Sequence, residues 1–316
     1  MHPPPSHQPL IILLAGPTGV GKTECAIDLA LQLGGEIINA DSMQVYRRME
    51  IGTAKPGPVQ RALVPHHLLD VVDPDEPFDA GHYLQQAQSV IEALHIRGKL
   101  PLVVGGTGLY LKVLTRGICP VPPGDLLVKQ QLLKEVEEFG LVRLHEELLQ
   151  IDPESARRIH SHDRQRIVRA LEVFRATGRP LSHWQAGHGF REPLYRTLKL
   201  FLFRPREELY RRIDARVETM MAEGFLEEVR GLLAQGYTLR LKPMQSLGYR
   251  QLVRHLQGEC SLPEAIHDIQ RDTRRYAKRQ ITWFRADPEF VWCSPADQQR
   301  MLELVTEAIS DSSRPF

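Results

Sequence analysis

The chain has 316 residues, of which 42% are hydrophobic and 25% charged, as is typical of soluble globular proteins with a sizeable core. Its 40 Lys and Arg residues balance 39 Asp and Glu residues, so the net charge of +1 excludes a globally basic nucleic-acid binder, and a basic surface must be local. The four cysteines lack any Cys-x-x-Cys spacing, which argues against a zinc ribbon or redox pair, and we expect a monomeric cytoplasmic protein without signal peptide or membrane span.

The first predicted elements are a strand, a glycine loop and a helix. Leu10 to Leu14 form a short apolar run typical of a buried parallel strand. Apolar residues then recur at helical spacing after Thr23 until Gly34 and Gly35 end the helix. Between the two lies the pattern G-x-x-x-x-G-K-[ST], which in this context predicts a phosphate-binding loop. We expect its contacts to come from Gly16, Pro17, Thr18, Gly19, Val20, Gly21, Lys22 and Thr23.

Two further strands are predicted before residue 110. Ile37 and Ile38 indicate a strand that ends at Asp41, and Leu102 to Val104 indicate another, followed by a glycine turn and a helix from about Leu109. Ligands of open α/β sheets lie at the carboxyl ends of the strands, so Asp41 should face the same crevice as the glycine loop. The alternative is that Asp41 only caps a helix begun by Ser42.

The sequence lacks an acid where nucleotide hydrolases usually have one. Such enzymes place an acid at the end of a buried strand to hold magnesium. Here Leu102 to Val104 runs into Gly105, Gly106 and Thr107. Asp70 and Asp73 can supply such an acid instead, so a triphosphate remains open for the loop.

The sequence pattern changes from about residue 118. A Pro-rich linker starts near Ile118, and residues 126–178 are almost wholly helical in pattern. A strand is predicted at Leu198 to Phe203, followed by helices and a last strand at Glu289 to Trp292. We therefore predict an α/β fold: a P-loop NTPase-like parallel sheet core flanked by helices (residues 1–117 and 196–316), with a helical insertion domain at 118–195.

Two stretches concentrate basic residues. Residues 271–285 contain six Arg or Lys and one acid. As a helix, this segment would present a basic face and an aromatic face, which suits phosphate contacts, although a solvated surface helix is the alternative. The basic face comprises Arg271, Arg275 and Lys278 with Thr282, and the other face comprises Tyr276, Gln280 and Trp283. The insertion carries the second stretch, namely Arg157, Arg158, Arg164, Arg166 and Arg169.

Several long motifs together resemble one known family. They are GPTGVGKT, ADSMQVYRRMEIGTAKP, PHHLLDVVDPDEPFDAG, LPLVVGGTGLYL, DRQRIVRALEV and YAKRQITWFR. In this order they resemble the bacterial tRNA dimethylallyltransferases, also called isopentenyl diphosphate:tRNA transferases; Gly19-Val20 departs from the Ala-Ser often found there. The resemblance implies transfer of a dimethylallyl group from dimethylallyl diphosphate to N6 of the adenosine 3′ of the anticodon, in tRNAs that read U-starting codons, with release of diphosphate.

The resemblance also implies roles for residues near the glycine loop. Asp41 would be the base for the weakly nucleophilic adenine amine. Lys22 and the loop would stabilise the departing diphosphate, with Thr23 as ligand of a Mg²⁺ cofactor. Arg216 and Thr18 would contact the same diphosphate. We expect Asp41, Lys22, Thr18 and Arg216 to be the catalytic residues.

The implied macromolecular partner is the tRNA anticodon stem-loop. The insertion domain would clamp it, and the target adenosine would flip into a channel whose other end admits the diphosphate. The resemblance assigns tRNA contacts to Asp41, Ser42, Met43, Gln44, Thr107, Lys129, Gln165, Arg166, Ile167, Val168, Arg169, Gln245, Ser246, Leu247, Gly248, Tyr249, Arg250, Lys278, Arg279, Gln280, Ile281, Thr282, Trp283, Phe284 and Arg285. The residues leave open a P-loop small-molecule kinase, a prenyltransferase of free adenine nucleotides, and a non-enzymatic RNA-binding module.

Overall fold

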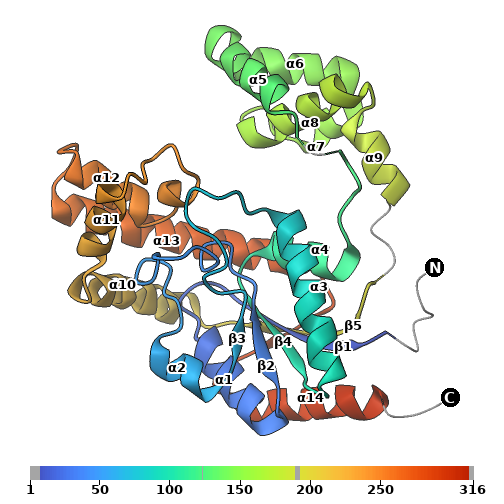
Figure 1. Ribbon diagram of the computed structural model, residues 1–316, viewed down its shortest axis with the longest axis vertical. Coiled ribbons are helices and arrows are strands. Elements are labelled where there is room, and N and C mark those ends of the chain that lie inside the picture. Colours follow the sequence, from blue (N-terminus) through green and yellow to red (C-terminus); the bar gives the residue numbers. More distant parts are fainter. Residues whose placement is uncertain (1–7, 123, 189–192, 313–316) are drawn as a thin grey trace. The chain divides into compact units, whose positions relative to one another are not determined.

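The structure is a computed structural model that describes residues 8–122, 124–188 and 193–312. Its chain divides into two compact units. The first comprises Met1–Thr115 with Leu194–Phe316, and the second comprises Arg116–Pro193. Figure 1 labels the elements of both units along the chain.

The first unit is built on a six-stranded sheet whose pairings are all parallel. The strands follow the order β3-β2-β4-β1-β5-β6, so that β1 lies inside the sheet between β4 and β5. This arrangement confirms the predicted α/β class with a parallel sheet core. The strands are β1 (Leu10–Ala15), β2 (Glu36–Asn39), β3 (His66–His67), β4 (Pro101–Gly105), β5 (Arg196–Leu202) and β6 (Phe290–Cys293).

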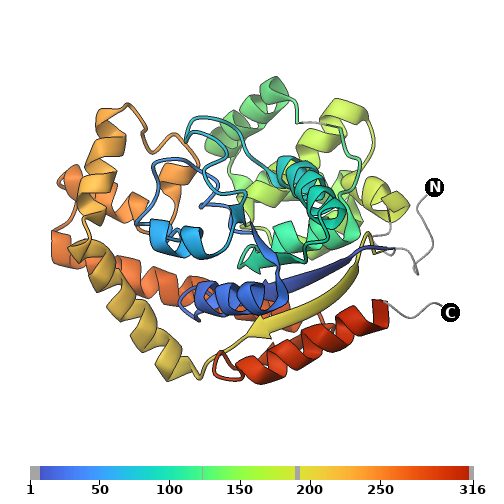
Figure 2. The same cartoon turned by 60° about the horizontal axis from the view of Figure 1, so that its bottom comes forward.

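Helices cover both faces of this sheet, which is why its inner strands β1 and β4 are apolar throughout. Ile12 and Leu14 of β1 belong to the buried cluster that includes residues of α1 (Lys22–Leu33) and α14 (Gln298–Ser312). The alternate residues Ile11 and Leu13 belong to the cluster on the opposite face. Figure 2 shows α14 running alongside strand β5, against which it packs. Buried contacts on both faces fix the position of the carboxyl edge, where the glycine loop begins.

The remaining helical elements of the first unit pack around the sheet, and some contribute to the buried clusters on both of its faces. The longest of them, α13, begins with a Ser261–Glu264 capping box. They are α2 (Pro58–Leu63), α3 (Ala80–Ile96), α4 (Gly108–Arg116), α10 (Arg206–Ala222), α11 (Phe225–Ala234), the 3₁₀ turn η2 (Pro243–Gln245), α12 (Tyr249–Leu256) and α13 (Leu262–Arg285).

The second unit is helical in its described residues. Its core contains Leu132, Leu144, Leu148, Ile167 and Leu171, all almost fully buried. Gly178 adopts the left-handed conformation that ends α8, as its place in the pattern predicts. The helices are α5 (Leu126–Phe139), α6 (Leu141–Ile151), α7 (Pro153–Arg158), α8 (Arg164–Thr177) and α9 (Leu181–His188). In the part of the chain that the structure describes, we find no helix with the length and apolar character needed to cross a membrane.

Candidate active site

The glycine loop connects the end of β1 to the start of α1. Gly19 and Gly21 have φ angles of 81° and 104°, a left-handed conformation that favours glycine and lets the loop turn sharply. The buried side chain of Val20 anchors the loop to the core. No side chain caps the first turn of α1, so its N–H groups and the positive end of the helix dipole are available to an anion.

Lys22 lies inside this loop and carries its main positive charge. Its Nζ donates to the carbonyl oxygens of Gly16 and Pro17, at 3.0 Å each. Burial lowers the pKa of Lys22 to about 8, and the nearby Asp41 carboxylate opposes this effect. The group is therefore still mostly protonated at pH 7 but loses its proton more readily than an exposed lysine, and a bound anion would raise its pKa again.

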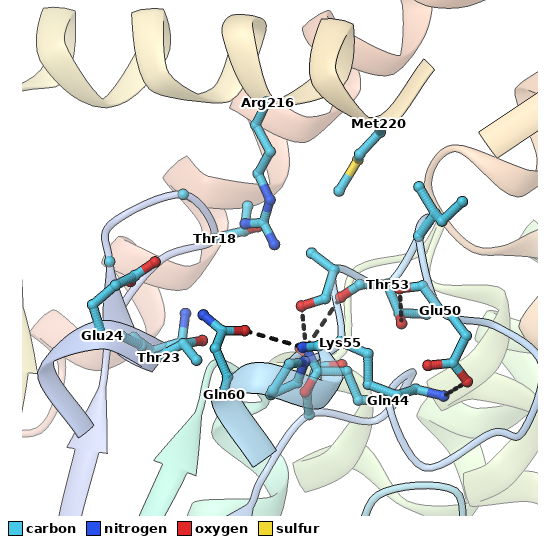
Figure 3. Close-up of a pocket in the computed structure, with 18 of the residues that line it drawn as sticks. Thr18, Thr23, Glu24, Gln44, Glu50, Thr53, Lys55, Gln60, Arg216 and Met220 are labelled. Carbon is cyan, nitrogen blue, oxygen red and sulfur yellow. Dashed lines mark hydrogen bonds and ion pairs between the residues drawn. The ribbon is translucent and has the colours of Figure 1, made fainter. Parts of the chain in front are cut away.

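Helix α10 adds two guanidinium groups that face the loop. Arg212 donates from Nε to the carbonyl of Gly19 at 3.0 Å, and Arg216 donates to the Thr18 hydroxyl at 3.4 Å. Figure 3 shows Arg216 extending from α10 towards Thr18. Among the described residues, none of Lys22, Arg212 and Arg216 forms an ion pair. Sequence reasoning missed Arg212, although its spacing of four residues from Arg216 puts both on one helix face.

Asp41 lies two residues beyond β2 at the same edge of the sheet. Its Oδ1 accepts a hydrogen bond from the Met43 N–H at 2.8 Å, and its own N–H donates to the Asn39 side chain at 3.1 Å. Residues 42–45 form a turn and not a helix, so the alternative of a helix cap at Ser42 is wrong. Within the described chain, Oδ2 of Asp41 has no hydrogen-bond partner, which leaves it free for a substrate.

Two neighbouring cavities meet at Asp41. The larger, of about 1090 Å³, contains the glycine loop and is drawn in Figure 3; the smaller, of about 340 Å³, extends towards α12 and α13. A phosphate group in the first and a base in the second would therefore meet at Asp41. The residues that line both are Thr18, Asp41, Thr53, Ala54, Arg216 and Met220.

The segment 245–250, predicted to contact tRNA, lines the smaller cavity, as do four further residues predicted to contact tRNA: Asp41, Ser42, Met43 and Arg279. Thr107 lies next to this group and accepts a hydrogen bond from the Ser42 N–H at 3.0 Å. The cavity also contains Tyr276 and Thr273, which sequence reasoning did not assign to a site. The predicted residues that line it beside Asp41 are Ser42, Met43, Gln245, Ser246, Leu247, Gly248, Tyr249, Arg250 and Arg279.

A segment between β2 and β3 forms one wall of the larger cavity and was not expected there. It contributes Glu50, Thr53, Lys55, Gln60 and Arg61. Figure 3 shows how the side chains of this wall bond to one another. Glu50, Thr53 and Lys55 lie in the motif ADSMQVYRRMEIGTAKP, but no site role was expected for them, and the tertiary structure identifies them as part of the cavity wall.

Asp70 and Asp73, the two acids that could hold magnesium in a kinase, are both paired with basic side chains. Burial raises the pKa of the Asp70 carboxyl, but hydrogen bonds from Lys55 and Arg61 outweigh this effect and hold the pKa below its ordinary value. Asp73 pairs with Arg47 at 3.5 Å, and neither acid lines the larger cavity. At the end of β4, a Cβ on Gly105 would lie 2.2 Å from the carbonyl oxygen of Ala40, so no acid fits there. These observations weigh against the kinase alternative.

The basic face predicted for α13 is partly neutralised. Arg271, Arg274 and Arg275 pair with acids of the same unit, whereas Lys278 and Arg279 are exposed and form no ion pair in the described chain. Of the other tRNA residues expected on this helix, Gln280 and Phe284 are buried. The rest on this helix are the half-buried Ile281 and the exposed Thr282, Trp283 and Arg285.

The residues of the second unit that were expected to contact tRNA are likewise partly exposed and partly buried or paired. Lys129, Gln165 and Arg166 are exposed. Ile167 and Val168 are buried in the helical core, so their side chains cannot reach an RNA. Arg169 donates to Glu172 and to the carbonyl of Pro122, at 3.0 and 3.1 Å, and Arg158, Arg164 and Arg166 also pair with acids.

Comparisons with known families agree with this geometry. A model of the IPP transferase family matches residues 44–287, and a model of the isopentenyl transferase family matches residues 9–62. The tRNA dimethylallyltransferase of Syntrophobacter fumaroxidans is 62% identical over 301 residues, which cover 95% of this chain and 88% of that protein. The tRNA dimethylallyltransferase of Geobacter sulfurreducens is 52% identical over 282 residues, which cover 89% of this chain and 91% of that protein.

Solved structures show the same likeness. The tRNA isopentenylpyrophosphate transferase of Bacillus halodurans has a TM-score of 0.72 and 35% identity, covering 97% of this chain and 98% of that one. A eukaryotic dimethylallyltransferase described as acting on tRNA has a TM-score of 0.83 and 29% identity, covering 98% and 81%. Since the matches run through nearly the whole chain, this protein is a transferase that belongs to the IPP transferase family, whose relatives are named tRNA dimethylallyltransferases.

Proposed function

We propose that this chain transfers the dimethylallyl group of dimethylallyl diphosphate to N6 of the adenosine 3′ of the anticodon, in tRNAs that read U-starting codons. One observation carries the proposal beyond family membership. Lys22, Arg212 and Arg216 surround the glycine loop and form no ion pair with any residue that the structure describes, and the Oδ2 of Asp41, which has no hydrogen-bond partner among these residues, lies in the same cavity. The site thus offers an anion cradle next to a base, which alkyl transfer to an amine requires.

The glycine loop and its cations are proposed to bind the diphosphate. As the allylic C–O bond breaks, its electron pair remains on the diphosphate, and the extra negative charge is stabilised by loop N–H groups, Lys22 and Arg216. Thr18 would contact the diphosphate and orient Arg216 through their hydrogen bond. Arg212 joins this set because its Nε donates to the carbonyl of Gly19 and the residue lines the larger cavity.

A Mg²⁺ ion fits this site if the diphosphate supplies most of its ligands. The described residues contain no cluster of three acidic, His or Cys side chains that would hold a metal alone. Mg²⁺ at phosphate sites usually keeps several waters and takes few protein ligands, and the Thr23 hydroxyl lines the larger cavity. We therefore propose Thr23 as the residue that would hold it; the bound ion would help to neutralise the diphosphate.

Asp41 is proposed to be the general base. The adenine N6 amine is a poor nucleophile because its lone pair is delocalised into the ring. As the C–N bond forms, the amine proton passes to Oδ2 of Asp41, while Oδ1 stays bonded to the Met43 N–H and fixes the carboxylate. The adenine would occupy the smaller cavity, which requires the nucleotide to flip out of the anticodon loop.

The exposed basic residues are proposed to bind the anticodon stem-loop. Lys278 and Arg279 would contact phosphates next to the smaller cavity, and Thr107 would contact the target nucleotide. The second unit, with Lys129 and Gln165 exposed, would clamp the stem. We also propose that the protein acts as a monomer, and that the reaction takes place in the cytoplasm with its tRNA substrate.

The proposal is tested by incubating the purified protein with Mg²⁺, unmodified tRNA and dimethylallyl diphosphate, with and without ATP. Mass spectrometry of tRNA nucleosides should find N6-dimethylallyl adenosine in both cases, with equimolar diphosphate, and added diphosphate should compete with the substrate. Modification that depends on ATP and accumulates ADP would refute the proposed use of the loop. Modification of free AMP in preference to tRNA would refute the proposed acceptor.

A further inference from the structure

Gln280 connects three parts of the first unit that lie far apart in the sequence. This α13 residue is only 6% exposed. Its Oε1 accepts a hydrogen bond from the Thr18 N–H at 2.9 Å, and its Nε2 donates to the carbonyl of Gly106 at 3.0 Å. The helix is thereby joined both to the glycine loop and to the turn after β4. Each end of the amide already has a partner inside the protein, and little of the side chain is exposed to a tRNA.

The structure around the amide admits few other side chains. A Cβ on Gly106 would lie 2.2 Å from Nε2 of Gln280, so glycine is needed there for the amide to approach. Thr18 requires an acceptor and Gly106 requires a donor, a combination that the neutral amide provides. A side chain without polar atoms would leave a buried N–H and a buried carbonyl unsatisfied.

The hydrogen bonds continue from Gln280 towards the cations. The main chain of Thr18 is held by Gln280, and its hydroxyl accepts a hydrogen bond from Arg216 at 3.4 Å. Thr18 and Arg216 both line the two cavities. A displacement of Thr18 would therefore move a residue of the glycine loop and break the hydrogen bond that Thr18 accepts from the half-buried Arg216. Displacements of about 1 Å at such sites can reduce catalysis about 100-fold.

We propose that Gln280 is a positioning residue for the diphosphate site and not a tRNA contact. Its amide fixes Thr18, and through Thr18 the guanidinium of Arg216, in the geometry that receives the diphosphate. The neighbouring Lys278 and Arg279 are exposed, so one helix presents cations to the outside and a positioning amide to the loop. This inference rests on the proposed function, which identifies the loop ligand as a diphosphate.

The test uses two variants that disturb the same contact from opposite sides. Gln280→Met keeps the length of the side chain and removes both hydrogen bonds. Gly106→Ala keeps Gln280 and displaces its amide, and its backbone conformation is not one of the left-handed glycine conformations. Lys278→Gln is the matched control on the same helix. Circular dichroism establishes that each variant is folded, and Gly106→Ala carries the test if Gln280→Met is not.

Each protein is measured for binding of inorganic diphosphate by calorimetry, for binding of unmodified tRNA by filter retention, and for kcat and the KM of dimethylallyl diphosphate. The two positioning variants should weaken diphosphate binding and raise that KM by about 10- to 100-fold, with tRNA affinity within about twofold of wild type. Lys278→Gln should show the opposite pattern, with weaker tRNA binding and unchanged diphosphate binding.

Two results would overturn the inference. The inference is wrong if the folded variants bind diphosphate as tightly as the wild-type protein. This holds even if their kcat is reduced, because a lower kcat alone indicates a smaller fraction of active protein. Weaker tRNA binding in Gln280→Met with normal diphosphate binding would show an RNA contact. If the variants lose diphosphate binding but the wild-type protein transfers no dimethylallyl group, the role of Gln280 stands and the proposed function fails.

Discussion

The charge of Lys22 can be titrated, which makes its proposed role open to a direct test. Burial lowers the pKa of Lys22 to about 8 in the free protein, and among the described residues its Nζ donates only to the carbonyls of Gly16 and Pro17. In the proposed function the ammonium form of Lys22 binds the diphosphate, and this form is present below pH 8 and lost as the pH rises through 8. One pH unit above the pKa, about one tenth of the protein keeps the charge. We therefore expect kcat/KM for dimethylallyl diphosphate to fall about tenfold per pH unit above 8.

The pH dependence of kcat, measured at saturating dimethylallyl diphosphate, should differ from that of kcat/KM. A bound diphosphate places negative charge next to Lys22 and raises its pKa, so kcat should remain level to a higher pH than kcat/KM. Diphosphate binding at pH 8.5 should likewise take up protons, which calorimetry in buffers of different ionisation enthalpy detects.

The assay measures initial rates from pH 7 to 10 at constant ionic strength and saturating tRNA. Lys22→Arg is the control, because a guanidinium stays charged throughout this range. Its kcat/KM should be lower but should show no fall near pH 8. A wild-type profile that is flat to pH 10, or a Lys22→Arg profile with the same fall, would refute the reasoning.

Three further predictions follow from the contacts of the site. Asp41→Asn should lower kcat by about 10²- to 10⁴-fold with little change in tRNA affinity, because it removes the base and keeps the carbonyl that Met43 bonds; normal turnover would rule out the base. Arg212→Gln should raise the KM of dimethylallyl diphosphate by about tenfold, since a charged hydrogen bond contributes on this scale, whereas the neighbouring Arg211→Gln should not; equal effects would argue against a specific contact. The double variant Lys278→Gln, Arg279→Gln should reduce the salt dependence of tRNA binding, the slope of log K against log salt, by about 1 to 2; an unchanged slope would contradict phosphate contacts.

Much of the fold follows from local patterns in the sequence. The apolar run from Leu10 ends at a glycine loop, and the structure has β1, the loop and α1 in that order. Such patterns succeed because strand alternation, helical spacing and left-handed glycines depend on residues close together in the chain. The short strand β3 was not predicted, because its two histidines have no apolar pattern.

The placement of Asp41 beside the loop followed from a topological rule, that carboxyl ends of parallel strands share one edge. Its free Oδ2 and its turn with Met43 depend on side-chain geometry that this rule does not describe. The family motifs identified the catalytic loop by resemblance, without showing which neighbouring residues complete the cavity.

The sequence by itself determined the phosphate loop, the parallel sheet core and the helical character of residues 126–178, because each is encoded by short-range spacing. Only the tertiary structure decided that Arg212 joins the cations of the loop, that Asp70 is neutralised by Lys55, and that Gln280 faces inwards to Thr18. The physical reason is that hydrogen bonds and ion pairs between distant segments decide whether a charge is available or consumed. Gln280 and Thr18 are 262 positions apart, and no local pattern relates them.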